Sequence, residues 1–325
     1  MKKFIIKTSV YILLILVMLE MLIRLFHLYT EDPPRIIDEY GVEKRKPDHN
    51  GYSVTGNRNQ NFSEFNINKD GFNSYREYNP TENKIEVAII GDSFIEGFHQ
   101  DYNESIGKKI EESVPDIEVY EYGYAGYDLA NQLHLIKSYK EQFKLIDVIV
   151  IYLNYESDLS RSKYTPNTDR VAMLSSNLFK IRDNIKLLSF TSKIGVLDPV
   201  KAFITGKAFT EENEGGYKTN EVDQVEKKIK RDLKYLNNFI SLVNLYGYDK
   251  DKTVMLLDSR KTSSNFLAYC DANNYNYIDF ASTFENSKKP TTLIYDWHWN
   301  DHGRTLIAEL LSNYLKRKLN QKINE

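Results

Sequence analysis

Ser93, Asp296 and His298 are the side chains of this chain whose types could combine in nucleophilic catalysis. Ser93 follows Gly91 and Asp92, and Asp296 stands two residues before His298, far along the chain. A serine hydroxyl becomes a good nucleophile when an imidazole takes its proton, and a carboxylate can orient that imidazole. Because Asp296 and His298 can meet if their loop turns, the pattern predicts a nucleophile, a general base and its orienting carboxylate.

The same residues also allow plainer interpretations. Ser93 could simply cap the helix that follows it. Gly126, in the glycine-containing loop at residues 122–127, could offer a backbone N–H to a ligand, or it could belong to an ordinary turn. Asp296, His298 and His302 could instead bind a metal ion, although no second ligand cluster accompanies them.

The elements that would position these loops alternate along the chain. Apolar, β-branched runs predict buried parallel strands at residues 85–90, 117–120, 147–153, 253–257 and 275–280. Helical patterns lie between and after them, at residues 105–113, 129–143, 222–245, 263–273 and 305–319. This alternation predicts an α/β fold of three αβα layers around a central parallel sheet, with the site at the carboxyl ends of the strands.

Over residues 84–320 the chain resembles the SGNH/GDSL hydrolase family. Gly91-Asp92-Ser93 is similar to the first block of the family, and Gly126 to the glycine of its second block. Asp296 and His298 resemble the fifth block in the form D-x-H-x-N-x-x-G, shorter than the usual D-x-x-H. The resemblance implies an SGNH/flavodoxin-like fold and an acyl-enzyme on Ser93, with no metal and no organic cofactor.

The resemblance also implies an oxyanion hole made by the backbone N–H groups of Ser93 and Gly126 and by an asparagine of the third block. That block departs from the family pattern, because residues 153–159 read Leu-Asn-Tyr-Glu-Ser-Asp-Leu. A gapless reading puts Ser157 in the asparagine position, and a shifted reading uses Asn154. We favour Asn154 because an amide is the better donor, with Ser157 as the alternative. His99, His134 and His302 match no motif and are interpreted as surface or packing residues.

The first 30 residues predict a membrane anchor. Three lysines precede an apolar stretch that begins at residue 8 and is long enough to cross a bilayer. Bulky residues follow it where a signal peptide would have small ones, so an uncleaved helix is favoured. Glu20 and Arg24 interrupt the stretch four residues apart, so they lie on one helix face and can pair near the outer interface, where both are expected to reach the head groups. The positive-inside rule then predicts that residues 31–325 lie outside the cytoplasm.

The rest of the chain divides into a stalk and extended lead-in at residues 31–83 and a catalytic domain at 84–320. An irregular insertion is expected at about 160–220. Cys270 is the one cysteine, which excludes an internal disulfide. With 43 basic and 46 acidic side chains and no basic stripe, nucleic acid is not an expected partner.

These features predict an extracytoplasmic serine esterase or acyltransferase that acts on O-acyl groups, above all O-acetyl groups, of a glycan. The anchor and the 24 tyrosines motivate that substrate class. Another small ester is the alternative substrate. The irregular third block favours a different hypothesis, in which a catalytically impaired SGNH-fold protein binds glycan or assists envelope assembly.

Overall fold

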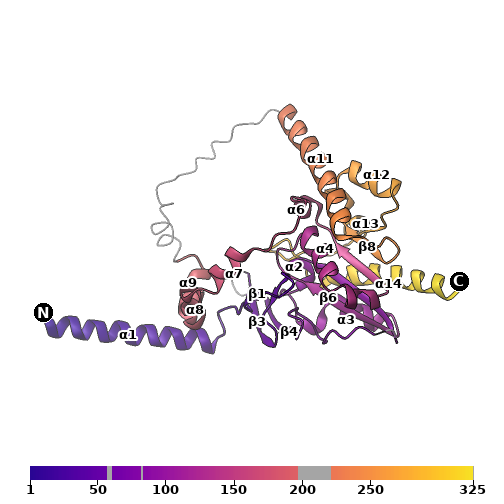
Figure 1. Ribbon diagram of the computed structural model, residues 1–325. Coiled ribbons are helices and arrows are strands. Elements are labelled where there is room, and N and C mark those ends of the chain that lie inside the picture. Colours follow the sequence, from indigo (N-terminus) through magenta and orange to yellow (C-terminus); the bar gives the residue numbers. More distant parts are fainter. Residues whose placement is uncertain (57–60, 82, 197–220, 325) are drawn as a thin grey trace.

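The computed structural model describes residues 1–56, 61–81, 83–196 and 221–324 (Figure 1). Its central sheet has five strands, all parallel, in the order β6-β5-β7-β8-β9. These strands are β5 (Ile85–Gly91), β6 (Ile117–Gly123), β7 (Val148–Tyr152), β8 (Thr253–Leu257) and β9 (Tyr277–Asp279). Each overlaps a predicted strand, and helices cover both faces, so the predicted three-layer α/β fold is confirmed.

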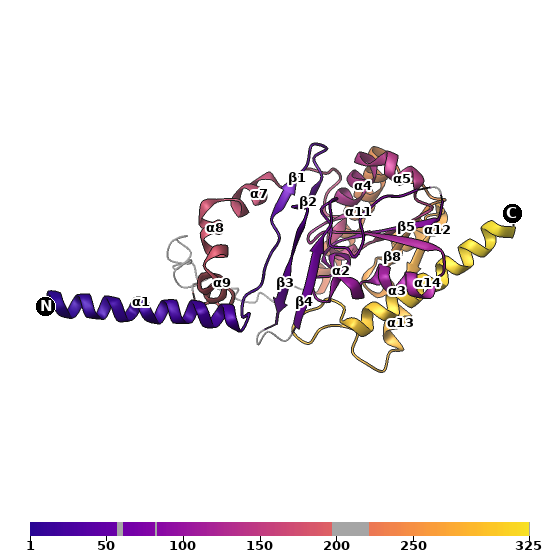
Figure 2. The same cartoon turned by 90° about the horizontal axis from the view of Figure 1, so that it is seen from below.

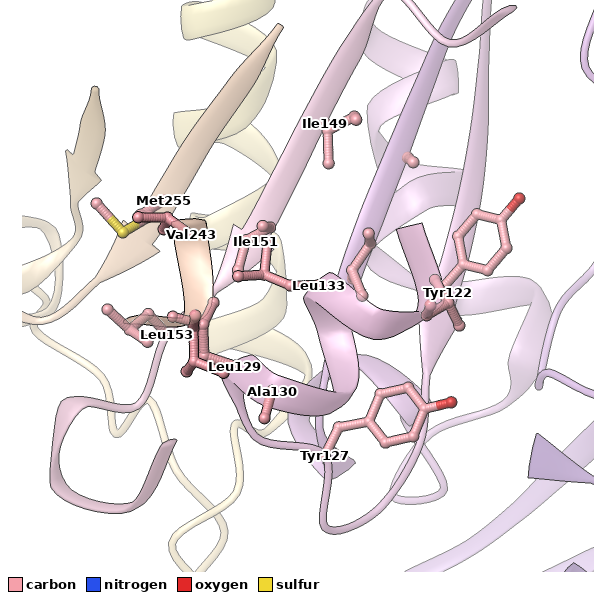
Figure 3. Packing of buried hydrophobic residues seen from close by; sticks show 14 of the residues in the cluster. Tyr122, Tyr127, Leu129, Ala130, Leu133, Ile149, Ile151, Leu153, Val243 and Met255 are labelled. Atoms are coloured by element: carbon pink, nitrogen blue, oxygen red, sulfur yellow. The ribbon is translucent and has the colours of Figure 1, made fainter. Parts of the chain in front are cut away.

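One face of the sheet packs against α4 (Leu129–Ser138), α5 (Lys140–Leu145), α11 (Glu221–Tyr246) and α12 (Ser264–Ala272). Figure 3 shows Ile151 of β7 near Leu133 of α4, in the cluster that also contains Ile149 and Leu129. Helix α4 begins in a capping box, in which Asp128 and Asn131 exchange hydrogen bonds with each other's backbone N–H. The helix predicted at 129–143 is therefore real, but it is divided at Tyr139 into α4 and α5.

The opposite face packs against α3 (Ile106–Ser113), α13 (Ala281–Glu285) and α14 (Asp301–Asn324). Val87 and Ile89 of β5 point to this side, whereas Ala88 and Ile90 point to the other, as the two-residue period of a strand requires. All four side chains are fully buried. Short helical turns complete the domain: α2 (Ser93–Glu96), η1 (Tyr102–Glu104), α6 (Tyr155–Asp158) and η3 (Ser259–Lys261).

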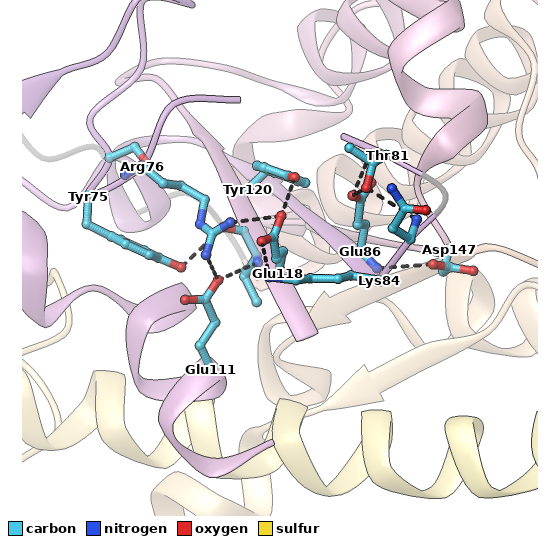
Figure 4. A network of polar contacts seen from close by, with 12 residues as sticks. Tyr75, Arg76, Thr81, Lys84, Glu86, Glu111, Glu118, Tyr120 and Asp147 are labelled. Carbon is cyan, nitrogen blue, oxygen red and sulfur yellow. Dashed lines mark hydrogen bonds and ion pairs between the residues drawn. The ribbon is translucent and has the colours of Figure 1, made fainter. Parts of the chain in front are cut away.

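The amino ends of β5 and β6 carry a network of charged side chains (Figure 4). Arg76 contacts Glu111 at 2.7 Å and Glu118 at 3.1 Å, and Lys84 contacts Glu118 at 2.7 Å. Tyr120 also donates a hydrogen bond to Glu118. These pairs fasten the segment before β5 to the sheet.

The predicted stalk at residues 31–83 is instead folded onto the domain. Strands β1 (Arg35–Ile37) and β2 (Glu43–Arg45) form one antiparallel pair, and β3 (His49–Thr55) and β4 (Asn61–Ile67) form another. The segment looked like a stalk because it is polar, but its polar groups have partners in the domain. Buried Arg45 is 2.7 Å from Glu96, which follows the candidate nucleophile by three residues.

The insertion expected at 160–220 has no helix at residues 160–167 and is largely helical from residue 168 onward, and residues 197–220 lie outside the described part. It contains α7 (Thr168–Leu174), α8 (Asn177–Asn184) and α9 (Lys186–Lys193), and no residue of these helices is buried. The sequence shows no clear period there because no face of the three helices enters a core. Helix α1 (Lys2–Leu25) is long and apolar enough to cross a membrane. In Figures 1 and 2, α8 and α9 lie beside its last turns.

Candidate active site

Ser93 opens helix α2, directly after strand β5. The side chain of Asp92 caps this helix by accepting a hydrogen bond from the backbone N–H of Phe94 at 2.8 Å. Asp92, and not Ser93, is therefore the helix cap, which leaves the serine hydroxyl available. A Cβ on Gly91 would lie 2.4 Å from the side chain of Ile95, so the tight turn into α2 requires glycine there.

The three side chains that the sequence singled out meet at this turn. The Oγ of Ser93 lies 2.7 Å from Nε2 of His298, and Nδ1 of His298 lies 2.6 Å from Oδ1 of Asp296. The same carboxylate oxygen accepts the backbone N–H of His298 at 3.2 Å. Asp296 thereby holds Nδ1–H of His298, which leaves Nε2 to accept the serine proton.

The short Asp–His spacing works because the loop folds back on itself. The backbone N–H of Leu293 donates to the carbonyl of His298 at 2.9 Å. The side chain of Asn300 donates to the carbonyls of Pro290 and Thr292 and accepts the backbone N–H of Gly303. The asparagine of the D-x-H-x-N-x-x-G pattern therefore holds the loop in shape.

The charge state of Asp296 suits an orienting role. Burial alone would raise the pKa of this carboxyl, but the hydrogen bonds from the ring and backbone of His298 outweigh burial, so its pKa lies below the usual value. The carboxylate stays ionised at neutral pH and can stabilise a positive charge that forms on His298 during catalysis.

His99 belongs to the site, which corrects its interpretation as a surface or packing residue. Its ring stacks on His298 with the centroids 4.3 Å apart, and its Nε2 lies 3.5 Å from Oδ2 of Asp296. Burial, followed by the proximity of His298 and Arg304, lowers the pKa of His99 to about 4. His99 is therefore neutral at pH 7 and supports the pair Asp296 and His298 from the side.

Asn154 and Ser157, the two candidates for the third block, lie in different surroundings. Asn154 lies two residues after the end of β7. It lines a cavity together with Phe94, the neighbour of Ser93. Ser157 is exposed, and its hydroxyl donates to Asp158 at 2.7 Å. The structure therefore favours Asn154 as the side chain that can face a ligand.

Gly126 lies in the turn after β6, at the same end of the sheet as Ser93. Its φ of +98° is a backbone conformation that favours glycine. The turn is held against α2, since Tyr124 N–H donates to the carbonyl of Gly91 and Ala125 N–H donates to the side chain of Glu96. Arg170 of α7 reaches over it, with a guanidinium nitrogen 3.3 Å from where a Cβ of Gly126 would lie.

The cavity beside Phe94 has a volume of about 660 Å³. Seven of its sixteen lining residues are aromatic, and Trp297, the residue between Asp296 and His298, is 83% exposed at its edge. Asp258 and Lys261 contribute polar groups. Its lining includes Phe94 and Trp297, the chain neighbours of Ser93 and His298, but not Ser93 and His298 themselves. A cavity of this size can hold a small organic molecule beside the candidate site.

The alternative metal site made of Asp296, His298 and His302 does not form. His302 lies against Ser287, with Nε2 2.9 Å from its Oγ. His99 takes the third place in a group that could by distance hold an ion. Its ring is stacked nearly parallel to that of His298, at 24°. Stacked imidazoles direct their nitrogen lone pairs side by side, which fits poorly with two ligands that converge on one ion.

Asp92, the residue before Ser93, and Asp158 are buried acids that interact with each other. Burial raises the pKa of Asp92 to about 7. Burial, and then repulsion from Asp92, raises the pKa of Asp158 well above its usual value. Asp158 accepts the backbone N–H of Asn154 at 2.9 Å, so it fixes the start of α6.

No family model matches the sequence, and no curated protein matches it. Several solved structures are similar to it over most of their length. A lipolytic protein of the G-D-S-L family from Veillonella parvula is 12% identical, covering 72% of this chain and 99% of that one, with a TM-score of 0.39. A lipase/acylhydrolase from Enterococcus faecalis is 10% identical, covering 72% and 96%, with a TM-score of 0.41. The esterase EstA from Pseudoalteromonas is 12% identical, covering 72% and 98%, with a TM-score of 0.40. Likenesses of this size do not assign an activity to the chain.

Proposed function

We propose that this protein is a serine esterase or O-acyltransferase whose nucleophile is Ser93. The observation that carries the proposal is the line of contacts from Ser93 through His298 to Asp296, at 2.7 and 2.6 Å. A hydroxyl, an imidazole and an ionised carboxylate in this order match the requirements of nucleophilic acyl transfer. These contacts favour an active enzyme over the catalytically impaired alternative. That alternative was motivated by the irregular third block, but Asn154 of this block lines the cavity.

In the first half of the reaction, Oγ of Ser93 attacks the acyl carbonyl carbon while its proton passes to Nε2 of His298. The bond from this carbon to the leaving alcohol breaks, and the proton on His298 passes to the alcohol oxygen. The backbone N–H groups of Ser93 and Gly126 and the amide of Asn154 would stabilise the negative oxygen of the intermediate. Water or a second hydroxyl then attacks the acyl-enzyme, and its proton returns to Ser93 through His298.

The proposed substrates are O-acyl groups, above all O-acetyl groups, of a glycan. The exposed indole of Trp297 and the aromatic wall of the cavity support this choice, since flat apolar faces suit the packing of sugar rings. The polar groups of Asp258 and Lys261 are the proposed partners of sugar hydroxyls. Other small esters remain a second class of substrate for the same chemistry.

The proposal includes an anchor in the membrane and a catalytic domain outside the cytoplasm. Helix α1 supports the anchor, because none of its most apolar 18-residue window is buried inside the protein. The lysines at residues 2, 3 and 7 precede the apolar stretch, which agrees with a cytoplasmic amino terminus.

The test compares the wild type with Ser93→Ala on p-nitrophenyl acetate and on O-acetylated glycans. We expect acetyl release by the wild type and its near-complete loss in the variant. Equal activity of the two proteins would exclude Ser93 as the nucleophile. Adding a glycan acceptor to the acyl donor separates the two reactions, since a transferase acylates the acceptor and an esterase releases free acid.

A further inference from the structure

Glu20 and Arg24, the charges that interrupt the apolar stretch of α1, bind the turn between α8 and α9. Glu20 accepts the backbone N–H groups of Lys186 and Leu187, at 3.0 and 2.7 Å, and so caps the start of α9. Arg24 donates to the carbonyl of Asn184, the last residue of α8, at 2.8 Å. Glu20 and Arg24 also pair with each other at 2.7 Å. Residues 177–196, which we name the elbow, are therefore fastened to one short part of α1.

The attachment lies at the depth of the bilayer if α1 crosses it. About 20 helical residues cross the hydrocarbon core, at roughly 1.5 Å each. Counted from Lys7, the last cation before the apolar stretch, this span reaches about residue 27. Glu20 and Arg24 then lie in its outer part, and the elbow lies beside them. Figures 1 and 2 both show α8 and α9 next to the last turns of α1 and not beyond its end.

The elbow exposes apolar side chains that nothing in the described structure covers. Leu178, Ile181 and Ile185 are 79%, 51% and 42% exposed. Their spacing of three and four residues places them on one face of α8 and its end. Ile194 and Val196, after α9, are 50% and 59% exposed. No residue of α8 or α9 is buried, so these apolar groups are not the margin of a core.

We propose that the elbow is a second membrane contact, seated in the outer leaflet beside α1. The occupant is the phospholipid bilayer that α1 itself enters, because Glu20 and Arg24 hold the elbow at that depth. Lipid around its apolar face would also remove water from the hydrogen bonds of Glu20, which strengthens them. The inference rests on the membrane anchor of the proposed function and is independent of the chemistry of Ser93.

The elbow is also connected to the catalytic loop. Lys193 of α9 donates to the carbonyl of Val54 in β3 at 2.7 Å. The next residue, Thr55, hydrogen-bonds the hydroxyl of Tyr295 at 2.8 Å. Tyr295 directly precedes Asp296 of the site. A membrane-seated elbow thus fixes the height of the active site above the bilayer, which suits a substrate held at the membrane surface.

The test measures lipid exposure in the full-length protein. Single cysteines replace Leu178 or Ile181 in a Cys270→Ser background, and a nitroxide spin label is attached to each. The protein is reconstituted in vesicles of phosphatidylcholine and phosphatidylglycerol, and label accessibility is measured for oxygen, which concentrates in lipid, and for a water-soluble nickel chelate. Leu14 in α1 is the lipid control, and Ile229, 54% exposed on α11, is the matched aqueous control.

Labels at residues 178 and 181 are expected to behave like the label at 14, with a several-fold higher ratio of oxygen to nickel accessibility than at 229. If 178 and 181 match 229 while 14 is in lipid, the elbow proposal is overturned and the anchor stands. An aqueous signal at 14 as well would overturn the anchor, and the elbow with it. Neither result would bear on the proposal that Ser93 is the nucleophile of an esterase, which the Ser93→Ala comparison tests separately.

Discussion

The two ends of the central sheet both carry acidic side chains, but in opposite surroundings. At the amino end, Glu111 and Glu118 face Arg76, and Lys84 reaches Glu118 as well (Figure 4). Burial would raise the pKa of Glu118, but the hydrogen bonds from Lys84 and Tyr120 and the charge of Arg76 outweigh it, and the pKa is lowered. These charges stabilise one another, although burial raises the pKa of Glu86 at the same end.

At the carboxyl end, the pKa of Asp92 and that of Asp158 are both raised, first by burial and then, for Asp158, by Asp92 itself. The hydroxyl of Ser93, the residue after Asp92, faces an imidazole 2.7 Å away. Groups with perturbed pKa values gather at functional sites. The comparison teaches that charge alone does not identify the site. Ion pairs occur at both ends, since Arg45 pairs with Glu96 close to Ser93. The candidate site is marked instead by the contact between serine and imidazole beside acids whose pKa values are raised.

His298→Ala tests this division most strongly. Without the general base, kcat for ester hydrolysis should fall by about 10³-fold or more. His302→Ala is the matched control, because His302 contacts Ser287 outside the site and should leave kcat nearly unchanged. Steady-state kinetics on p-nitrophenyl acetate measure both. A similar loss in the two variants would mean that the loop, and not the imidazole of His298, matters.

Asn154→Ala and Ser157→Ala separate the two candidates for the oxyanion hole. Loss of the amide of Asn154 should lower kcat by about 10²- to 10³-fold, with a smaller effect on KM. Ser157→Ala removes an exposed hydroxyl and should change kcat by no more than about threefold. The reverse order of effects would restore the gapless reading of the third block.

His99→Ala and His99→Phe ask how the side support of the triad works. Alanine removes both the stacked ring and the contact with Asp296, so kcat should fall about tenfold, the equivalent of roughly 1.4 kcal/mol. Phenylalanine keeps a ring against His298 and should recover part of that loss. Equal kcat in the wild type and in both variants would show that His99 only fills space.

Asp92→Asn and Glu118→Gln should change stability with opposite dependence on pH. The pKa of Asp92 is raised on folding, so its protonated form favours the folded state, and this contribution is lost as pH rises from about 4 to about 7. Asp92→Asn should therefore gain stability relative to the wild type over that range.

Glu118 has a pKa that is lowered on folding, so its ionised form stabilises the folded state at pH values above the pKa of the unfolded chain. Glu118→Gln should therefore be most destabilised near pH 7 and least destabilised in acid. Urea unfolding at several pH values measures this, and parallel curves would remove the distinction between the two ends.

The sequence was sufficient for the parts of the fold that local pattern determines. Apolar runs predicted the strands of the central sheet, and three motifs in order predicted that Ser93, Asp296 and His298 would meet. The lead-in was misread as a stalk because the buried polar residue Arg45 has partners that no local pattern indicates, among them Glu96, 51 residues away.

Tertiary contacts without a local pattern could not be predicted. His99 follows Ser93 by six residues, and only the return of the distant loop stacks it on His298. Glu20 and Arg24 pair with each other, as their spacing predicts. Their further partners, backbone groups at the junction of α8 and α9 more than 150 residues away, have no local pattern. The choice between Asn154 and Ser157 likewise required knowing which side of α6 faces the cavity.

The most direct test of the central claim is covalent capture of the nucleophile. The full-length protein is incubated with a fluorophosphonate ester, which phosphorylates activated serines, and the intact mass and the modified peptide are determined. One adduct on Ser93 is expected in the wild type, with none in Ser93→Ala and a much slower reaction in His298→Ala. No adduct in the wild type, or an adduct that persists in Ser93→Ala, would contradict the account.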